Sequence, residues 1–560
     1  MNTTKTTAQP MLIRGLHLDC RAQMLRFTKI LTVMEDAARW GYNTILLEYS
    51  DRFPFEGRLA GIKAPDALTK DEVHTLLAKA KSLGLQVIPL QQCLGHLYYV
   101  LRCKEFAALG DGYRENCRED SPAVFASHID TPPSAWSLCP SHPESLGIFQ
   151  EMAKQILALH PGCRYFHLGG DEVALDPECP ICAEHLPEGG VGHLLGRHYL
   201  SAAKWLRSLG PDPILWSDMI LAYPETLASL RGHVTVMDWD YWSTDRPSAD
   251  YVIWGVRDNI HNPEKWPEPQ QRIVRKHVYA TEPALIKPFP HVELLREQGF
   301  PVIMASAARS YGDSFAVPMA RHMDNSVAAA HKARACNTLG AVVTSWALRR
   351  SPWPLTEPIL MAAAGAMQDP SLSREEMDLQ FAREHFGVNE PGLARIFSLL
   401  SESSEKAIKS MDIISSRAYF HQSTGHFYAE DYGDIAAKYQ GSKEKILAAY
   451  EELTQACLNA KSLLGRAEPK TERQHEYVRF WRWAIDLLAH FAAFAPQVLI
   501  LPGQHDKETL KNFRAAAIKL QEETNALLMP WHTDRTMESE DQIRFGVHLK
   551  FIDEMLGALL

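Results

Sequence analysis

The segment Arg164–Val173, which reads RYFHLGGDEV, places two adjacent acids directly behind a short apolar run. The run Tyr165–Leu168 is typical of a buried strand, and the two glycines after it allow the backbone to turn tightly. Asp171 and Glu172 are therefore expected at the carboxyl end of a strand, where open α/β sheets and barrels keep their chemistry. A like charge next door tends to keep one carboxyl group protonated near neutral pH, which suits a general acid. The competing interpretation is an acidic turn that caps the following helix.

The surrounding chain bears on this choice, because short β-rich runs alternate with amphipathic helical stretches from Leu12 to about Ala366. Strands are expected at residues 12–19, 44–49, 86–91, 165–168, 213–218, 234–241, 301–306 and 341–346. Helices are expected between them at 27–40, 70–82, 144–159, 193–208 and 320–336. Eight strands that alternate with helices predict an α/β fold, a (β/α)8 TIM barrel that occupies residues 11–368.

The pattern changes after about Asp369, where long helical periodicity replaces the alternation. Helices are expected at 373–385, 392–408, 442–464, 472–494 and 507–528, and the first opens with Ser373 and Glu376 at capping-box spacing. The sequence therefore predicts an α-helical C-terminal domain over residues 369–560. One hypothesis for its role is that it packs on the barrel and mediates a homodimer.

Composition limits the possible partners. The 560 residues carry a formal net charge of −10 without a basic cluster, which argues against nucleic acid and against an anionic membrane surface. No apolar run is long enough to span a bilayer, and the first residues lack the apolar core of a secretory signal. Ten cysteines without regular spacing favour a reducing compartment. A cytoplasmic protein is expected.

The ends of the expected strands carry an unusual number of polar and aromatic residues. Tryptophan faces pack on the C–H faces of sugar rings, while acids and arginines bind sugar hydroxyls. Any single tryptophan is more often a core residue, but three of them around two carboxylates favour a sugar site. The residues are Arg14, Asp19, Glu48, Asp51, His96, Asp171, Glu172, Trp216, Asp218, Trp239, Asp240, Tyr241 and Trp346.

The sequence HLGGDE at His167–Glu172 resembles the signature of glycoside hydrolase family 20, the β-N-acetylhexosaminidases. Further stretches resemble the hexosaminidase D-like branch of that family in the same order along the chain. They are Leu47–Gly57, Leu94–His96, Leu215–Met219, Trp239–Tyr241, Ala305–Ala307 and Val343–Trp346. The resemblance covers about residues 11 to 366 and does not extend into the helical C-terminal region.

The resemblance implies a retaining, substrate-assisted hydrolysis of terminal β-linked GlcNAc or GalNAc, in which the 2-acetamido oxygen of the substrate attacks the anomeric carbon. Glu172 would then be the general acid, and Asp171 would orient the acetamido group and stabilise the oxazolinium intermediate. Tyr241 is the expected donor to the acetamido oxygen, with Tyr311 as the alternative. The implied partner is a glycan with a terminal N-acetylhexosamine, and no cofactor is expected.

The same resemblance assigns the residues that surround the sugar. Arg14 would hold the outer hydroxyls, and His96 would influence the protonation of the acid. The remaining substrate-binding residues are expected to be Trp216, Trp239 and Trp346, which box in the acetamido methyl group, together with Glu48 and Asp218.

The adjacency of Asp171 and Glu172 agrees with this mechanism. Retaining enzymes with a protein nucleophile need two carboxylates that face each other across the sugar, about 5 Å apart. Neighbours in sequence project differently from a turn and cannot easily oppose one another, whereas a nucleophile within the substrate removes that need. The residues Ala347–Arg350 after Trp346 lack an acid that many family members carry there, which leaves GlcNAc versus GalNAc preference open.

Cys179 and Cys182 form a CxxC motif in the loop after the acidic pair, and His185 follows nearby. A lone CxxC needs two further ligands before zinc is indicated. Cys139 or Cys163 could supply one, although nothing in the sequence requires it. These cysteines are therefore weak candidates for a structural metal, and the reaction itself needs no metal.

Two other functions are compatible with the sequence. One is a carbohydrate-binding barrel that has lost activity, although the intact acidic pair argues against it. The other is a metal-dependent barrel hydrolase with Glu48, Asp171, Glu172 and Asp218 as oxygen ligands.

Overall fold

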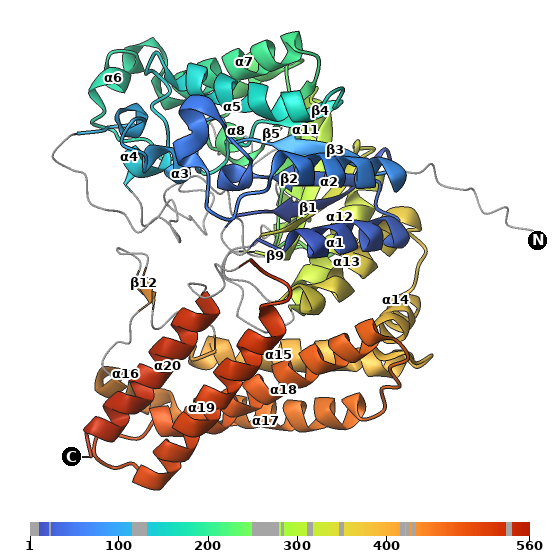
Figure 1. Ribbon diagram of the computed structural model, residues 1–560, viewed down its shortest axis with the longest axis vertical. Helices are drawn as coiled ribbons and strands as arrows, with labels where there is room; N and C mark the ends of the chain where they lie inside the picture. Colours follow the sequence, from blue (N-terminus) through green and yellow to red (C-terminus); the bar gives the residue numbers. More distant parts are fainter. Residues whose placement is uncertain are drawn as a thin grey trace, which may run out of the picture.

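A computed structural model of the protein describes most of the chain. The described residues are 11–21, 24–114, 132–248, 279–281, 285–310, 317, 319–346, 352–414, 420–421, 426–427, 432–533 and 540–559. Within them an N-terminal barrel is followed by a layer of long helices, drawn in orange and red below the barrel in Figure 1.

Eight parallel strands close into the barrel in the order β1-β10-β9-β6-β5-β4-β3-β2. The barrel closes because β1 pairs with both β2 and the last strand, β10. All eight strands coincide with the predicted ones to within about three residues, so the predicted (β/α)8 barrel is confirmed. Their bounds are β1 Ile13–Asp19, β2 Thr44–Glu48, β3 Gln86–Leu90, β4 Tyr165–His167, β5 Asp212–Trp216, β6 Thr235–Trp239, β9 Val302–Arg309 and β10 Gly340–Ser345.

Side chains alternate between the two faces of the barrel wall, as the period of a strand requires. In β2, Leu46 points into the barrel interior with Ile88 and Val342, whereas Ile45 and Leu47 pack outward against the helices. Both faces of these strands are therefore buried, which explains why the strands read as nearly continuous apolar runs.

Helices cover the outside of the barrel. The predicted ones appear as α1 (Phe27–Trp40), α2 (Lys70–Ser82), α5 (Ser145–Leu159), α7 (Gly190–Ser208) and α12 (Ala320–Ala335). The sequence prediction missed α13 (Trp353–Gln368), whose residues are buried almost throughout and which therefore lacks a polar face. The other helices of this part are short: α3 (Tyr98–Leu101), α4 (Pro133–Trp136), α6 (Pro180–Ala183), α8 (Asp218–Ala222), α9 (Thr226–Leu230) and α11 (Pro290–Glu297).

The C-terminal region is helical, as predicted. Its long helices are α14 (Arg374–Phe381), α15 (Arg395–Ser410), α17 (Lys443–Leu464), α18 (Glu472–Val498) and α19 (Lys507–Leu528), with α16 (Tyr432–Tyr439) and α20 (Glu540–Gly557) in addition. The capping box is confirmed, because the Ser373 side chain accepts from the Glu376 N–H and Glu376 bonds back. Two short pairs complete the structure, β7 (Tyr279–Thr281) with β8 (Leu285–Ile286) and β11 (Phe420–His421) with β12 (His426–Phe427).

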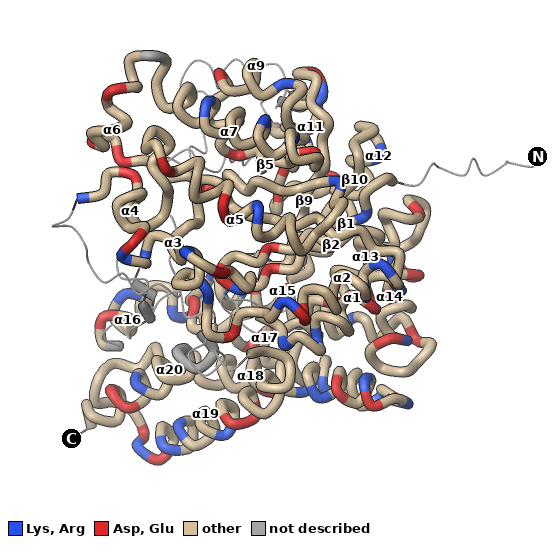
Figure 2. The backbone as a smooth tube through the Cα atoms, turned by 45° about the horizontal axis from the view of Figure 1, so that its top comes forward, with Lys and Arg blue, Asp and Glu red and all other residues tan. Residues whose placement is uncertain are grey.

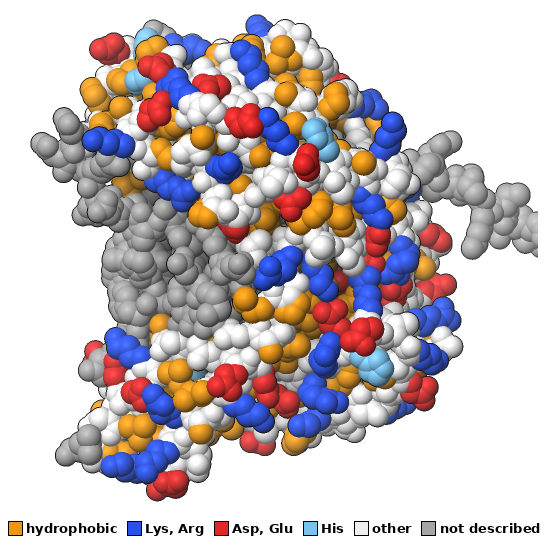
Figure 3. All heavy atoms as spheres, viewed as in Figure 1, with side chains coloured by type: hydrophobic (Ala, Val, Ile, Leu, Met, Phe, Trp, Pro, Cys, Tyr) orange, Lys and Arg blue, Asp and Glu red, His pale blue; other side chains and the backbone are white. Residues whose placement is uncertain are grey.

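Charged side chains of both signs are interspersed over the described surface. On the face shown in Figure 3, lysines and arginines lie beside acids on both the barrel and the helices. Figure 2 shows the same alternation along α19. None of the described helices combines the length and the apolar character that a membrane crossing requires.

A buried polar contact joins the helical region to the barrel. Arg473 of α18 donates through Nη1 to Oδ1 of Asp36 on α1, at 2.6 Å, and its Nη2 also contacts Asp36. Glu357 of α13 lies 3.5 Å from Arg473 and accepts a hydrogen bond from the Tyr477 hydroxyl. Asp36 is almost fully buried, and its pairing with Arg473 offsets the cost of removing it from water. At Glu357 burial outweighs the attraction of Arg473 and raises the pKa of the carboxyl to about 8.

We expect Arg473→Gln to lower the free energy of unfolding by about 3 kcal/mol, because it leaves the buried acids without their main cation. Arg482→Gln is the matched control, since Arg482 is exposed on the same helix, and its effect should stay within about 0.5 kcal/mol. Denaturant titrations of both variants, followed by circular dichroism, measure the difference. Equal midpoints for the two variants would show that the contact does not stabilise the fold.

Candidate active site

The acidic pair lies at the carboxyl end of β4, in a turn that requires glycine. Gly169 has a φ of +64°, and a Cβ atom built there would lie 2.0 Å from Oε1 of Gln92. Gln92, which follows β3, uses this space to accept from the Gly170 N–H at 3.0 Å and to donate to Oδ1 of Asp171 at 2.9 Å. The glycines thus admit the side chain that positions Asp171.

Glu172 and His96 both adopt a left-handed backbone, with φ values of +47° and +55°. This conformation is strained for residues with a side chain and persists only where neighbours hold it in place. Asp218 accepts from the Glu172 N–H at 2.8 Å, and the Trp136 indole donates to the Glu172 carbonyl at 2.8 Å. The backbone of Glu172 is therefore fixed from both sides.

His96 connects the two carboxylates. Its Nε2 lies 3.2 Å from Oδ2 of Asp171 and 3.3 Å from Oε2 of Glu172, and its ring packs against Trp136 with centroids 4.4 Å apart. Burial opposes a charge on the ring, but the attraction of the two carboxylates prevails and raises the pKa of His96 to about 10. Arg21 Nη1, 3.3 Å from the other ring nitrogen, acts against this charge.

The positive charge on His96 determines whether Asp171 is ionised. Burial acts to raise the pKa of Asp171, but the His96 cation and the hydrogen bonds from His96 and Gln92 hold that pKa below its ordinary value. Asp171 is therefore a carboxylate at neutral pH. The pKa is raised at Asp218, where burial first, and then the charges of Asp171 and Glu172, bring it to about 8.

The predicted aromatic residues gather around this pair. Trp216 is 1% exposed and packs against His167 and Trp346, with ring centroids 4.4 and 6.1 Å away. Trp239 lies 5.1 Å from the Tyr241 ring and donates through its indole to Oδ1 of Asp218 at 3.1 Å. The Trp346 indole donates to the Tyr241 hydroxyl at 3.2 Å, and the Thr344 side chain also hydrogen-bonds this hydroxyl.

The arginine of the site is Arg21, which the sequence prediction missed. It follows β1 and is 4% exposed, with Nε 3.0 Å from Asp19 Oδ1 and 3.6 Å from Glu48 Oε1. Its guanidinium also stacks 5.1 Å from the Trp346 ring centroid. Glu48 is fully buried, and its other oxygen lies 3.3 Å from Nε2 of His17, so its carboxylate is held in place next to Arg21.

The prediction that Arg14 binds substrate is wrong. Arg14 lies at the amino end of β1, and its guanidinium donates to the carbonyls of Gly41 and Met11 at 2.8 and 3.1 Å. It also shares a face with Leu16, which packs outward against the helices. Both its end of the strand and its direction exclude it from the site.

The cysteines of the CxxC motif and two unpredicted residues after β3 also lie close to the acidic pair or to its loop. Cys139 joins Cys179 and Cys182, as the sequence allowed, and Asp111 completes a cluster that the sequence did not indicate. Gln92 and Trp136 were also missed, although both follow the third strand, where site residues are expected. Tyr311 and the segment 347–350 lie outside the described residues.

A closed parallel barrel with acids and aromatic side chains at the carboxyl ends of its strands defines the class of TIM-barrel proteins, whose active sites lie at that end. Residues 17–252 match the model of the glycosyl hydrolase family 20 catalytic domain. The match covers the barrel from β1 to β6 and agrees with the resemblance found in the sequence.

Individual proteins are also similar to this chain. Human Hexosaminidase D is 29% identical over 239 residues, which cover 41% of this chain and 45% of that protein. Bovine Hexosaminidase D is 30% identical over 236 residues, which cover 41% of this chain and 63% of that protein. The chain therefore spans less than two thirds of either relative. The structure of Streptomyces plicatus beta-hexosaminidase aligns with a TM-score of 0.44 and 17% identity, over 67% of this chain and 68% of that one.

We expect the imidazole of His96 to stay doubly protonated up to at least pH 8, because the adjacent carboxylates raise its pKa to about 10. The stabilisation that this charge contributes is complete below about pH 6.5, the ordinary pKa of histidine, and is lost as the pH rises through 10. Spectra of the protein labelled with ¹⁵N-histidine, assigned by comparison with His96→Gln, measure the state of the ring.

His167 provides the internal control for these spectra. It is the last residue of β4, before the turn that carries the acidic pair, but burial lowers its pKa to about 3, so its ring should be neutral at the same pH. A neutral His96 ring at pH 7 would mean that Arg21 outweighs the two carboxylates, and would contradict the expected charge.

Proposed function

We propose that the protein is an exo-acting β-N-acetylhexosaminidase that hydrolyses terminal β-linked GlcNAc or GalNAc with retention, through an oxazolinium intermediate. The observation that carries the proposal is the placement of Asp171 and Glu172 side by side on one nitrogen of His96, among Trp216, Trp239 and Trp346. The match to the glycosyl hydrolase family 20 catalytic domain supports it.

In the first step Glu172 protonates the glycosidic oxygen while the acetamido oxygen of the substrate attacks the anomeric carbon. Asp171 accepts the acetamido N–H and stabilises the positive charge that develops on the oxazolinium ring. This role requires an ionised carboxylate, and Asp171 is ionised at neutral pH because its pKa is lowered. In the second step Glu172 takes a proton from a water molecule as the water oxygen attacks the anomeric carbon. The bond from that carbon to the acetamido oxygen breaks, which restores the acetamido group and leaves the hemiacetal product.

Tyr241 donates its hydroxyl proton to the acetamido oxygen in this proposal. Burial raises the pKa of Tyr241, so the hydroxyl keeps its proton, and the bond from the Trp346 indole orients it. Asp218 acts indirectly, because both of its oxygens are engaged by the Glu172 N–H and the Trp239 indole. It holds the general acid in position rather than contacting the sugar.

The geometry of the pair favours the nucleophile of the substrate over a protein nucleophile. Two carboxylates that act on opposite faces of a sugar must leave room for the ring between them. Asp171 and Glu172 instead contact the same nitrogen of His96 and lie beside one another. A nucleophile within the substrate needs no second carboxylate across the ring.

The metal-dependent alternative finds less support. Two of its four acids are engaged elsewhere, since Glu48 lies against His17 and Arg21, and the oxygens of Asp218 accept from protein donors. The inactive-barrel alternative differs from our proposal only in turnover. Hydrolysis assays with and without a chelator therefore separate all three functions.

We expect aryl β-N-acetylglucosaminide or β-N-acetylgalactosaminide to be hydrolysed, and the plain aryl β-glucoside not, because only the former carry the nucleophile. Glu172→Gln should lose about 10²- to 10⁴-fold in rate with poor leaving groups and less with good ones. Asp171→Asn should lose about 10²-fold or more even with good leaving groups, since it acts on the acetamido group. Steady-state kinetics on matched aryl substrates measure both effects.

These assays also identify the outcomes that contradict the mechanism. Turnover of the β-glucoside without turnover of either N-acetyl substrate would exclude substrate assistance. Full activity of Asp171→Asn would show that its assigned role is wrong.

We expect Arg21→Gln to lower kcat/KM by about 10²-fold, because Arg21 contacts Asp19, His96 and Trp346 and a displaced group in the site costs a factor of this size. Arg14→Gln is the matched control and should keep the activity, since Arg14 lies at the opposite end of β1. If Arg14→Gln lowered kcat/KM and Arg21→Gln did not, Arg14 rather than Arg21 would be the arginine that acts in the site.

We also propose that the protein works in the cytoplasm and acts on glycans with a terminal N-acetylhexosamine. We propose further that it forms a homodimer and that residues 369–560 form a separate domain. Free thiols at Cys20, Cys93 and Cys457 support a reducing compartment. Leu458, exposed by 58% on α17, is a candidate contact between two copies. Cell fractionation tests the location, and a solution mass of one chain in light scattering would contradict the dimer.

A further inference from the structure

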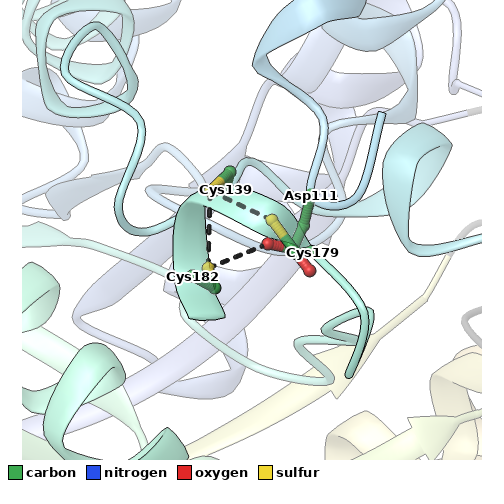
Figure 4. A group of neighbouring side chains, drawn as sticks. All are labelled: Asp111, Cys139, Cys179 and Cys182. Atoms are coloured by element: carbon green, nitrogen blue, oxygen red, sulfur yellow. Dashed lines mark hydrogen bonds between the residues drawn. The ribbon is translucent and has the colours of Figure 1, made fainter. Parts of the chain in front are cut away.

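Beside the candidate active site, three sulfur atoms and one carboxylate converge on a common point (Figure 4). The Cys139 sulfur lies 3.8 Å from that of Cys179 and 3.4 Å from that of Cys182, and the Cys182 sulfur lies 3.2 Å from Oδ1 of Asp111. All four ligand atoms lie within 4.8 Å of one another. We propose that Asp111, Cys139, Cys179 and Cys182 bind one zinc ion that holds together the loops after β3 and β4.

The separations agree with a tetrahedral zinc site. Sulfur ligands lie about 2.3 Å from zinc, so the ligand atoms of a tetrahedron are about 3.8 Å apart. The pairs around Cys139 have this spacing to within a few tenths of an ångström. Two sulfurs in a disulfide would be about 2.0 Å apart.

The burial of the group calls for a cation. The four residues are at most 3% exposed, and the cysteines pack against Leu194, Ile181 and Leu186. A carboxylate placed among sulfur atoms and aliphatic side chains is costly unless a positive charge offsets it. A divalent metal ion supplies that charge at the point where the four ligand atoms meet.

Backbone groups already orient the ligands. Oδ2 of Asp111 accepts from the Asp176 N–H, which directs Oδ1 toward the sulfur atoms. The sulfur of Cys179 accepts from the backbone N–H groups of Cys182 and Gly112. Such hydrogen bonds to the ligands are typical of metal sites, because they fix the ligand atoms before the metal arrives.

The chemistry of the ligands favours zinc over other common metals. Thiolates select zinc, whereas magnesium and calcium prefer oxygen ligands alone. Four protein ligands fill the tetrahedron and leave no open position for water or substrate, which is the arrangement of a structural site. The ion therefore has no direct role in hydrolysis, and the proposal does not depend on the proposed function.

The ion would connect the parts of the chain that hold the acidic pair. Asp111 and Cys139 lie in the segment between β3 and α5, and Cys179 and Cys182 lie in the loop after β4. Directly before Cys139 along the chain, Trp136 donates to the Glu172 carbonyl and Ser137 Oγ accepts from the Ala174 N–H. These two hydrogen bonds join the loops after β3 and β4, and the zinc ion would add a further link between the same two loops.

The first test is the metal content of the full-length protein, purified without a metal-affinity step from zinc-supplemented medium. We expect zinc at about one atom per chain by mass spectrometry of the elements. Replacement by cobalt should give the ligand-field absorption of tetrahedral cobalt and the charge-transfer band of its bonds to thiolate. Both measurements use the unmodified chain, so neither depends on the folding of a variant.

Cys182→Ser and Asp111→Asn should lower the zinc content and weaken the cobalt spectrum, and the melting temperature should fall. Cys457→Ser is the matched control, since Cys457 is equally buried but lies on α17, and it should retain its zinc. Brief exposure to a chelator should leave hydrolysis unchanged as long as the zinc stays bound.

Three results would overturn the proposal. One is protein without zinc whose cysteines are all free thiols, and another is a disulfide between Cys139 and either Cys179 or Cys182. The third is a double variant, Cys139→Ser with Cys182→Ser, that still binds zinc as the unmodified chain does.

Discussion

Closure of the barrel is the constraint on which the other features depend. The hydrogen bonds between β1 and β10 complete a sheet of eight parallel strands, so that every carboxyl end lies on one rim. Residues far apart in sequence, such as Arg21, His96, Asp171, Asp218 and Trp346, therefore meet within a few ångströms. Both faces of the strands are buried, so the rim is where the barrel wall can present charged groups.

Burial of charge then determines the chemistry of the rim. Asp171 remains ionised because His96 and Gln92 bind it, whereas burial first, and then the neighbouring acids, raise the pKa of Asp218 to about 8. The same principle operates at the contact between Asp36 and Arg473, and at the cysteine cluster if it binds zinc. In each case a buried acid has an identifiable partner, because an isolated charge is too costly away from water.

Most of the fold was predictable because its signals are local. Apolar runs of strand length and amphipathic helices recur in order, and the two glycines before Asp171 indicated the turn. The helix α13 escaped prediction because burial on all sides removed its period. The family resemblance implies a site role for Arg14, but the alternation of the strand turns it outward beside Leu16. Arg21, two residues beyond the strand, gave no comparable signal, since its position depends on its bond to Asp19.

The sequence by itself determined the barrel, the helical C-terminal region and the acidic pair with its tryptophans, because strand period, helix period and motif order are properties of neighbouring residues. Only the tertiary structure decided which acid is ionised, which arginine serves the site and which residues complete the cysteine cluster. Those outcomes depend on distances and burial between segments such as the loops after β3 and β4, and the order of residues along the chain does not specify these quantities.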